Sequence, residues 1–246
     1  MRPLNALPDT TEAPQQSALR YVDDFFDGVF APLERWLPGL VATLQQRQSE
    51  GRLTGGQLAA LLEAGANEVL DTSDRPIYGA GFCASGHLVT EGNPLAWWQG
   101  QQRGLLASST FGPGQAAIDL VRLEWYRVPE ATGQRHVAGP FVDYLCSNEV
   151  TLTSAIPVSV AGEFWGVACA DVLVSSLEDA LHPMLATFAS TTLVNASGRV
   201  VLSNEPDFET GDRYRGLPFG SSAADLTEGR RIVSSRKYPF SLVIAE

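Results

Sequence analysis

Residues 150–174 read VTLTSAIPVSVAGEFWGVACADVLV, two apolar runs joined by Ala161, Gly162 and Glu163. Both runs, 150–160 and 163–174, are rich in residues that favour strands. The link between them is short enough for a β-hairpin. Pro157, Gly162, Glu163 and Asp171 interrupt the apolar character, so the stretch is not a membrane span. We therefore predict two long antiparallel strands here.

Other segments upstream and downstream add to this pair. Strand-like runs occur at 75–84, 118–127 and 135–145, and a second hairpin is predicted at 191–195 and 200–204, with 232–234 and 240–245 as closing strands. We expect residues 94–102 to form a short helix or an ordered loop.

Helical periodicity dominates the first part of the chain. Apolar residues recur at three- and four-residue spacing over 17–48, which predicts a long helix with breaks or kinks at Pro32 and Pro38. Further helices are predicted over 54–70 and 175–185. Helices followed by an antiparallel meander predict an α+β fold, in which the long N-terminal helix packs on one face of a five- or six-stranded sheet.

The composition excludes some classes of protein. The chain has 246 residues, 44% of them hydrophobic and 18% charged, which is ordinary for a globular protein. Its 17 Lys and Arg against 28 Asp and Glu give a net charge of −11. Because phosphate-backbone binding depends on clustered basic residues, nucleic acid is not an expected partner. The N-terminus shows no apolar leader segment, so we expect a cytoplasmic chain.

The residues with reactive side chains form no known catalytic or metal-binding motif. Cys83, Cys146 and Cys169 are widely spaced, which favours three reduced core thiols over a disulfide framework or a zinc site. No HExxH or GxSxG pattern is present. We therefore expect neither a metal nor a cofactor. A nucleophilic pair of Cys146 with His136 is the weaker alternative, because the spacing alone does not establish its geometry.

Asp171 is the one charged residue within the apolar run 164–174. An ionised carboxylate among apolar neighbours is costly unless a cation or several hydrogen-bond donors compensate it. One interpretation is that the ammonium group of a ligand is that partner. The other is an internal salt bridge, with Arg122 or Arg135 as the cation, or a bond to loop N–H groups.

Several short motifs in order resemble the Cache domains, PAS-like sensor modules usually found outside the membrane in bacterial chemoreceptors and histidine kinases. The motifs are Trp125-Tyr126-x-x-Pro129, Gly139-Pro140-Phe141-Val142-Asp143, Thr151-x-Thr153-x-Ala155-Ile156-Pro157-Val158 and Gly166-Val167-x-x-Ala170-Asp171-Val172. The resemblance covers roughly residues 18–175. Residues 194–201 are similar to the hairpin that opens the second module of double Cache proteins. The resemblance implies a stand-alone soluble member with a ligand-binding domain at 16–175. It further implies an abbreviated second PAS-like module or C-terminal extension at 176–246.

A subgroup of that family resembles amino-acid sensors, in which an Arg binds the ligand carboxylate and an Asp holds its ammonium group. Trp125, Tyr126 and Asp171 match the pattern. Ile118 stands at the position of the first Tyr, and Leu123 at that of the Arg. Arg122 is one residue away, and in a regular strand it would face the other side unless a bulge re-aims it.

The site implied by the resemblance is an acidic, aromatic-lined pocket for an amine or amino-acid-like metabolite. Its candidate residues, named from the motif and its surroundings, are Asp171, Trp125, Tyr126, Asp143, Glu124, Arg122 and Tyr144, with Trp165 as a further possible wall. Asp143 could equally cap a turn, and each aromatic residue could be core. Carboxylates and aromatic faces together suit a cationic amine. Trp36, Trp97 and Trp98 are expected to be structural.

The expected function is a non-catalytic, small-molecule-binding sensor domain. Two alternatives are an enzyme that uses Asp171 or Asp143 as general base and a scaffold without a ligand. We expect a homodimer contact along the N-terminal helix and an output protein on a separate chain.

Overall fold

The computed structural model describes residues 14–49, 51–106, 119–144, 146–215 and 229–245. The helices and strands occur in the following order: α1 Pro14–Gln48, β1 Leu53–Thr54, α2 Gly55–Thr72, β2 Gly79–Ala84, β3 Val89–Glu91, β4 Leu95–Gln99, β5 Gly104–Leu105, the 3-10 helix η2 Leu120–Arg122, α3 Glu124–Thr132, β6 His136–Val142, β7 Val150–Val160, β8 Glu163–Leu173, α4 Val174–Leu185, β9 Thr191–Asn195, β10 Val200–Ser203, β11 Arg230–Ser234 and β12 Phe240–Ala245.

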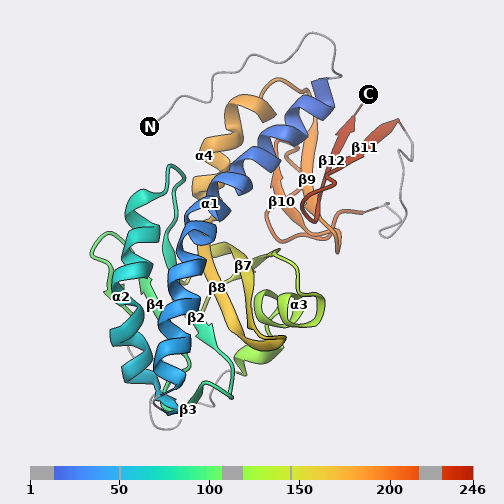
Figure 1. Ribbon diagram of the computed structural model, residues 1–246. Helices are drawn as coiled ribbons and strands as arrows, with labels where there is room; N and C mark the ends of the chain where they lie inside the picture. The colour runs from blue at the N-terminus through green and yellow to red at the C-terminus, as the bar shows by residue number, and fades with distance from the viewer. Residues whose placement is uncertain (1–13, 50, 107–118, 145, 216–228, 246) are drawn as a thin grey trace.

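Two antiparallel sheets form the body of the protein. The larger has six strands in the order β5-β4-β2-β8-β7-β6, and the smaller has four in the order β10-β9-β12-β11. A short parallel pair joins β1 to β3. Figure 1 shows the larger sheet with α2 and α3 in one half of the molecule, and the smaller sheet with α4 in the other. The predicted α+β class and the long helix on a six-stranded sheet are confirmed.

Helix α1 runs the length of both halves. Its 35 residues extend about 50 Å at 1.5 Å per residue. It packs on α2, β7 and β8 in one half and on α4, β11 and β12 in the other. The helix continues through Pro32 and Pro38, so the expected break does not occur. Fully buried side chains on both sides of Pro32, including Val29, Phe30 and Leu33, hold the helix in place despite the lost backbone hydrogen bond.

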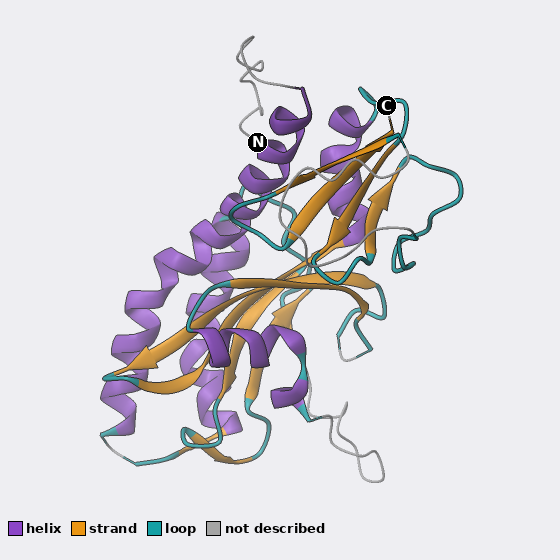
Figure 2. Cartoon of the chain, turned by 90° about the vertical axis from the view of Figure 1, so that its right-hand side faces the viewer, coloured by secondary structure: helices purple, strands orange, loops and turns teal. Residues whose placement is uncertain are grey.

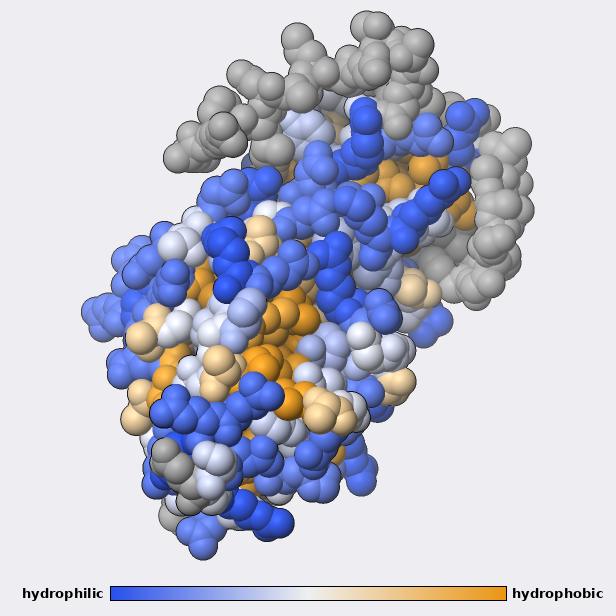
Figure 3. Space-filling model, in the orientation of Figure 1, coloured by the Kyte–Doolittle hydropathy of each residue, from blue (hydrophilic) through white to orange (hydrophobic). Residues whose placement is uncertain are grey.

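The larger sheet separates two hydrophobic clusters. Along β8, Ala168, Ala170 and Val172 face the cluster under α1 and α2, whereas Val167 and Cys169 face the cluster under α3. This alternation is what the strand pattern predicts. Figure 2 shows α3 and the long helices on opposite sides of this sheet. Hydrophilic residues cover most of the face drawn in Figure 3, with hydrophobic residues gathered in the middle of the lower half.

Two predicted elements are wrong. Residues 118–127 are not a strand: η2 and α3 occupy the described part, and Ile118 lies outside the described residues. The buried residues of α3 are Trp125, Tyr126 and Pro129, a helical spacing, and Gly133 ends the helix in the left-handed conformation. Residues 94–102 are not a helix or loop, because 95–99 form β4. Among the described residues, no helix has the length and apolarity that crossing a membrane requires.

One hydrogen bond in the core joins the two sheets. The side-chain amide of Asn195, at the end of β9, donates from Nδ2 to the carbonyl oxygen of Gly139 in β6 at 2.7 Å. Its Oδ1 accepts from the backbone N–H groups of Ser197 and Arg199 and from the Ser197 hydroxyl. The hairpin between β9 and β10 is thereby tied to the strand that carries Phe141.

Candidate functional site

A cavity lies on the face of the larger sheet that α3 covers. Its lining residues come from β4, α3, β6, the β6–β7 turn, β7 and β8: Leu95, Trp97, Trp125, Phe141, Asp143, Cys146, Thr153, Cys169 and Asp171. The cavity has a volume of about 30 Å³. Since a water molecule needs about 10–15 Å³ by the same measure, there is room for about two water-sized groups.

Asp171 lies at the base of the cavity, in a cross-strand row of the sheet. Gly79 in β2 pairs with Asp171 in β8, and Asp171 pairs with Thr153 in β7. The side chain of Asp171 is buried at 5% exposure, and its Oδ1 accepts a hydrogen bond from Thr153 Oγ1 at 2.6 Å. Burial raises the pKa of Asp171 well above its ordinary value, and the nearby Asp143 carboxylate raises it further, while Thr153 opposes the shift.

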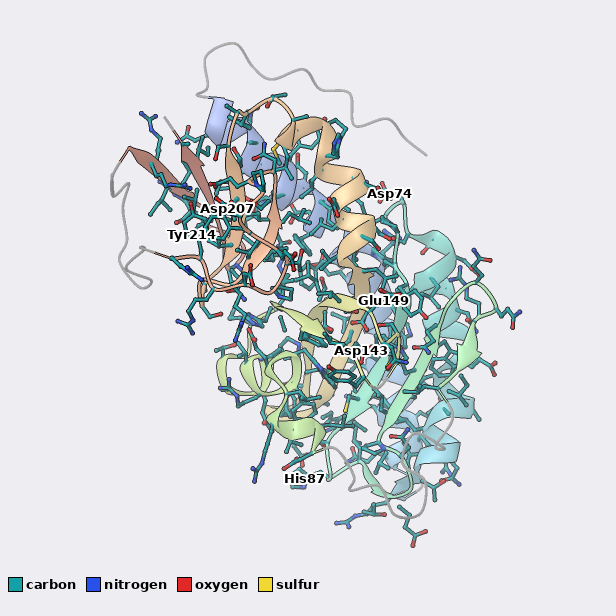
Figure 4. All side chains as sticks on the ribbon, turned by 180° about the vertical axis from the view of Figure 1, so that it is seen from behind. Asp74, His87, Asp143, Glu149, Asp207 and Tyr214 are labelled. Atoms are coloured by element: carbon teal, nitrogen blue, oxygen red, sulfur yellow. The ribbon has the colours of Figure 1, made fainter. Side chains whose placement is uncertain are left out.

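The second carboxylate, Asp143, comes from the turn after β6. It is 6% exposed, and its two oxygens accept from the backbone N–H groups of Cys146 and Ser147, each at 3.2 Å. Asp143 therefore caps the turn, as one interpretation expected, and it also lines the cavity. Figure 4 shows Asp143 in the half of the molecule that holds the larger sheet, away from Asp207 and Tyr214, which lie with the smaller sheet.

A bulge in β6 brings Phe141 and Asp143 to the cavity. The register of β6 against β7 shifts between Ala138 and Phe141. Gly139 has φ of +111°, and a Cβ there would lie 2.7 Å from the carbonyl oxygen of Thr151, so only glycine fits. Such a bulge redirects the side chains that follow it.

Three aromatic side chains wall the cavity, from three different elements. Trp97 comes from β4, Trp125 from the first turn of α3 and Phe141 from β6. They line the same cavity as the two carboxylates. This combination suits a cationic group, because the faces of aromatic rings attract cations.

No lysine or arginine is among the described residues that line the cavity. Arg122 is 85% exposed and pairs with Asp119 at 2.8 Å. Arg135 pairs with Glu34 and Asp27 on α1 and lies over the Phe30 ring. Neither arginine reaches Asp171, so the internal salt bridge considered from the sequence does not form. Within the described part of the chain, the Thr153 hydroxyl is the side-chain partner of Asp171.

The remaining predicted residues do not line the cavity. Tyr126 is buried beside it, with its ring centroid 5.5 Å from that of Phe164. Glu124 is exposed and bonds to His136 at 2.8 Å. Tyr144 is 75% exposed. Trp165 packs in the hydrophobic cluster under α1 and α2, on the face of the sheet opposite the cavity. It does so because Gly166, with φ of +143°, interrupts the alternation along β8.

Sequence reasoning missed several cavity residues, of which Trp97 is the most important. The sequence predicts a structural role for Trp97. The alternation along β4 instead places Trp98 in the cluster under α1 and α2 and Trp97 in the cavity wall. The opposite strand contained a usable signal. Gly79 and Gly81 lack side chains on the cavity face, which leaves space for a large ring on the neighbouring strand.

The thiols and histidines do not form a reactive pair among the described residues. His136 bonds to Glu124 rather than to Cys146. Burial raises the pKa of the Cys146 thiol, and the carboxylates Asp143 and Asp171 raise it further. In the described ranges, no group of three or more His, Cys, Asp or Glu side chains is arranged to hold a metal.

No protein-family model matches the chain, and no curated protein matches it. Several solved structures do. The ligand-binding domain of the Campylobacter jejuni chemoreceptor Tlp3 in complex with L-valine has a TM-score of 0.60 at 11% identity, over 95% of this chain and 89% of that one. A methyl-accepting chemotaxis protein X has a TM-score of 0.55 at 14% identity, over 92% and 99%. The extracellular domain of the putative histidine kinase mmHK1S-Z3 has 0.56 at 10%, over 95% and 89%.

These similarities extend through both sheets, because each covers more than nine-tenths of the chain. At such low identity they show the fold and not the ligand. The chain therefore has the fold of chemoreceptor sensory domains, the PAS-like Cache fold that its sequence motifs resemble.

Proposed function

We propose that this chain is a non-catalytic sensor module that binds a small cationic amine, with the ammonium group of the ligand against Asp171. The observation that carries the proposal is a buried carboxylate in a cavity wall with no cation beside it among the described residues. A buried carboxylate without a cation is costly when ionised. An ammonium group from outside the chain would offset that cost.

The electrostatics of the cavity favour a cation. Asp143 and Asp171 both line it, and Trp97, Trp125 and Phe141 present aromatic surface. An ammonium ion beside Asp171 lowers the pKa of that carboxyl, because it stabilises the ionised form. Binding is therefore accompanied by release of a proton wherever the pH lies below the pKa that Asp171 has in the empty protein.

A ligand carboxylate has no cationic partner among the described lining residues. Leu123 occupies the position of the expected Arg, and Arg122 points to solvent. Residues 107–118, outside the described part, contain no charged residue in the sequence. An amine without a carboxylate is thus favoured over an amino acid, although the Tlp3 domain was solved with L-valine.

The test is a thermal-shift panel of alkyl amines, amino acids and carboxylates on the wild type and Asp171→Asn. Amines should raise the midpoint of the wild type and not of the variant, by the mass-action stabilisation of a bound ligand. Calorimetric titration of the best amine in two buffers of different ionisation enthalpy should detect proton release. A panel in which carboxylates alone shift the midpoint would overturn the proposal, and consumption of the bound amine would indicate an enzyme.

We also propose that residues 16–175 form the ligand-binding domain and 176–246 an abbreviated second module. The six-stranded sheet and the cavity belong to the first range, and the four-stranded sheet to the second. A homodimer contact along α1 and a separate output protein stay predictions.

A further inference from the structure

Trp97 carries a buried hydrogen-bond donor that no acceptor among the described residues satisfies. The side chain is 3% exposed and lines the cavity, and its Nε1 has no hydrogen-bond partner in the part of the chain that the structure describes. Buried indole N–H groups are usually paired, because an unpaired donor loses its bond to water without replacement. This donor needs an explanation that core packing does not supply.

The N–H edge of the indole lies beside Asp171. A Cβ on Gly79 would be 2.9 Å from Nε1 of Trp97, so the indole passes directly over this glycine. Gly79 is the cross-strand partner of Asp171, and paired residues of neighbouring strands face the same side of a sheet. The unpaired donor and the buried carboxylate are therefore neighbours on the floor of one cavity.

An unpaired acceptor is present in the same cross-strand row. Gln99 pairs with Gly79 from the other side, and its Oε1 is buried with no hydrogen-bond partner within the described ranges. Its Nε2 donates to the carbonyl oxygen of Cys146, a cavity residue, at 3.0 Å. A hydroxyl group is the small group that both accepts from an N–H and donates to a carbonyl oxygen.

We infer that Trp97 Nε1 is a second recognition point and that the ligand is a small amino alcohol, whose hydroxyl accepts from Trp97 while its ammonium group pairs with Asp171. This inference rests on the proposed function and narrows its ligand class. Trp97 then determines specificity, because a site with an unpaired donor discriminates against an analogue that cannot satisfy it.

The experiment compares two pairs of isosteric probes that differ by a hydroxyl in place of a methyl group. They are ethanolamine against propylamine, and 3-amino-1-propanol against butylamine. The dissociation constants are measured by titration on the wild type, on Trp97→Phe and on Trp98→Phe. Trp98→Phe is the matched control, since Trp98 is adjacent to Trp97 in sequence but faces the hydrophobic cluster under α1 and α2.

The wild type should bind the amino alcohol about tenfold more tightly than the alkyl amine in at least one pair, the value of one hydrogen bond. Trp97→Phe should abolish that preference, and Trp98→Phe should keep it. Each ratio is internal to one variant, so a partial loss of stability cancels. The same ratio in the wild type and Trp97→Phe, or no preference in the wild type, would overturn the inference and indicate that water satisfies the N–H group.

A second readout is measured on the wild type, and the variant serves only to assign the signal. In proton–nitrogen spectra of the wild type, the indole signal that is missing from Trp97→Phe should shift strongly with the amino alcohol and little with the alkyl amine. Trp36, Trp98 and Trp165, which do not line the cavity, serve as internal references. If all four probes fail to bind the wild type, the proposed amine function itself falls; if amines bind without moving this signal, only the role of Trp97 falls.

Discussion

Oγ1 of Thr153 lies 2.6 Å from Oδ1 of Asp171, across the pairing of β7 with β8. The bond holds the carboxyl group in the cavity wall but does not compensate the charge of its ionised form, since a hydroxyl carries no charge. Asp171 thus keeps its need for a cation after folding, and that need is the basis of the proposed recognition.

Thr153→Val should lower the free energy of unfolding by about 1 kcal/mol, the net value of one buried hydrogen bond. It should also weaken amine binding, because the ionised form of Asp171 loses its donor. Urea unfolding and calorimetric titration measure the two effects. Ser159→Ala is the control, since Ser159 is exposed on the same strand. Unchanged stability and binding in Thr153→Val would mean that the hydroxyl does not serve Asp171.

Asp171→Asn should stabilise the empty protein increasingly as the pH rises. The pKa of Asp171 is raised in the folded state. The unfolded carboxyl ionises near pH 4, while the folded one keeps its proton to higher pH. Wild-type stability is therefore lost progressively from about pH 4 up to the folded pKa, and the amide does not titrate. Thermal midpoints of both proteins between pH 4 and 9 should diverge. Parallel curves would show that Asp171 does not have a raised pKa.

Gly79→Ala should destabilise the protein and close the cavity. The new Cβ would lie 2.8–2.9 Å from three atoms of the Trp97 indole, so the ring must move. Overpacking of this kind costs about 1–3 kcal/mol. Gly104→Ala in β5 is the matched control, because a Cβ there has no neighbour within 4 Å. Denaturant midpoints and amine titrations of the two variants provide the comparison, and equal behaviour would place the indole elsewhere.

Asn195→Ala should loosen the connection between the two sheets. It removes the bond to the Gly139 carbonyl and the acceptor of three donors in the β9–β10 hairpin. We expect a loss of about 1–3 kcal/mol, from polar groups left unsatisfied in the core. Hydrogen exchange should accelerate at the β6 bulge as well as in the hairpin, whereas Ser234→Ala, at an exposed position of the smaller sheet, should affect neither. Exchange confined to the hairpin would show that the sheets are not coupled through Asn195.

The long strands were predictable because their signal is local. Both β7 and β8 are apolar runs rich in residues that favour strands, and a two-residue turn, Ala161 and Gly162, separates them. Helix α3 is not predicted from the sequence, since residues 121–126 also alternate in the manner of a strand. The helix can be distinguished from a strand only when the pattern is followed further, to the buried Pro129 and to Gly133, which ends the helix.

The candidate site was only partly predictable. Asp171 stands out in the sequence as a charge among apolar residues, and the buried environment inferred for it is what the structure has. Glu124 and Tyr144 lie close to cavity residues in sequence, but the start of α3 and the β6–β7 turn direct them to solvent. Sequence distance does not specify which side of a turn or helix a side chain faces.

Local patterns in the chain are sufficient for the strands, for the long helix and for the costly position of Asp171, because period and burial cost depend on residue type alone. Among the described residues, the absence of a cation beside Asp171 and the place of Trp97 over Gly79 depend on strand register. That register pairs Gly79 with Asp171, 92 positions away along the chain, and Gly81 with Trp97, 16 positions away. A shift of one residue would turn each of these side chains to the other face. The cavity is therefore a property of the assembled sheet.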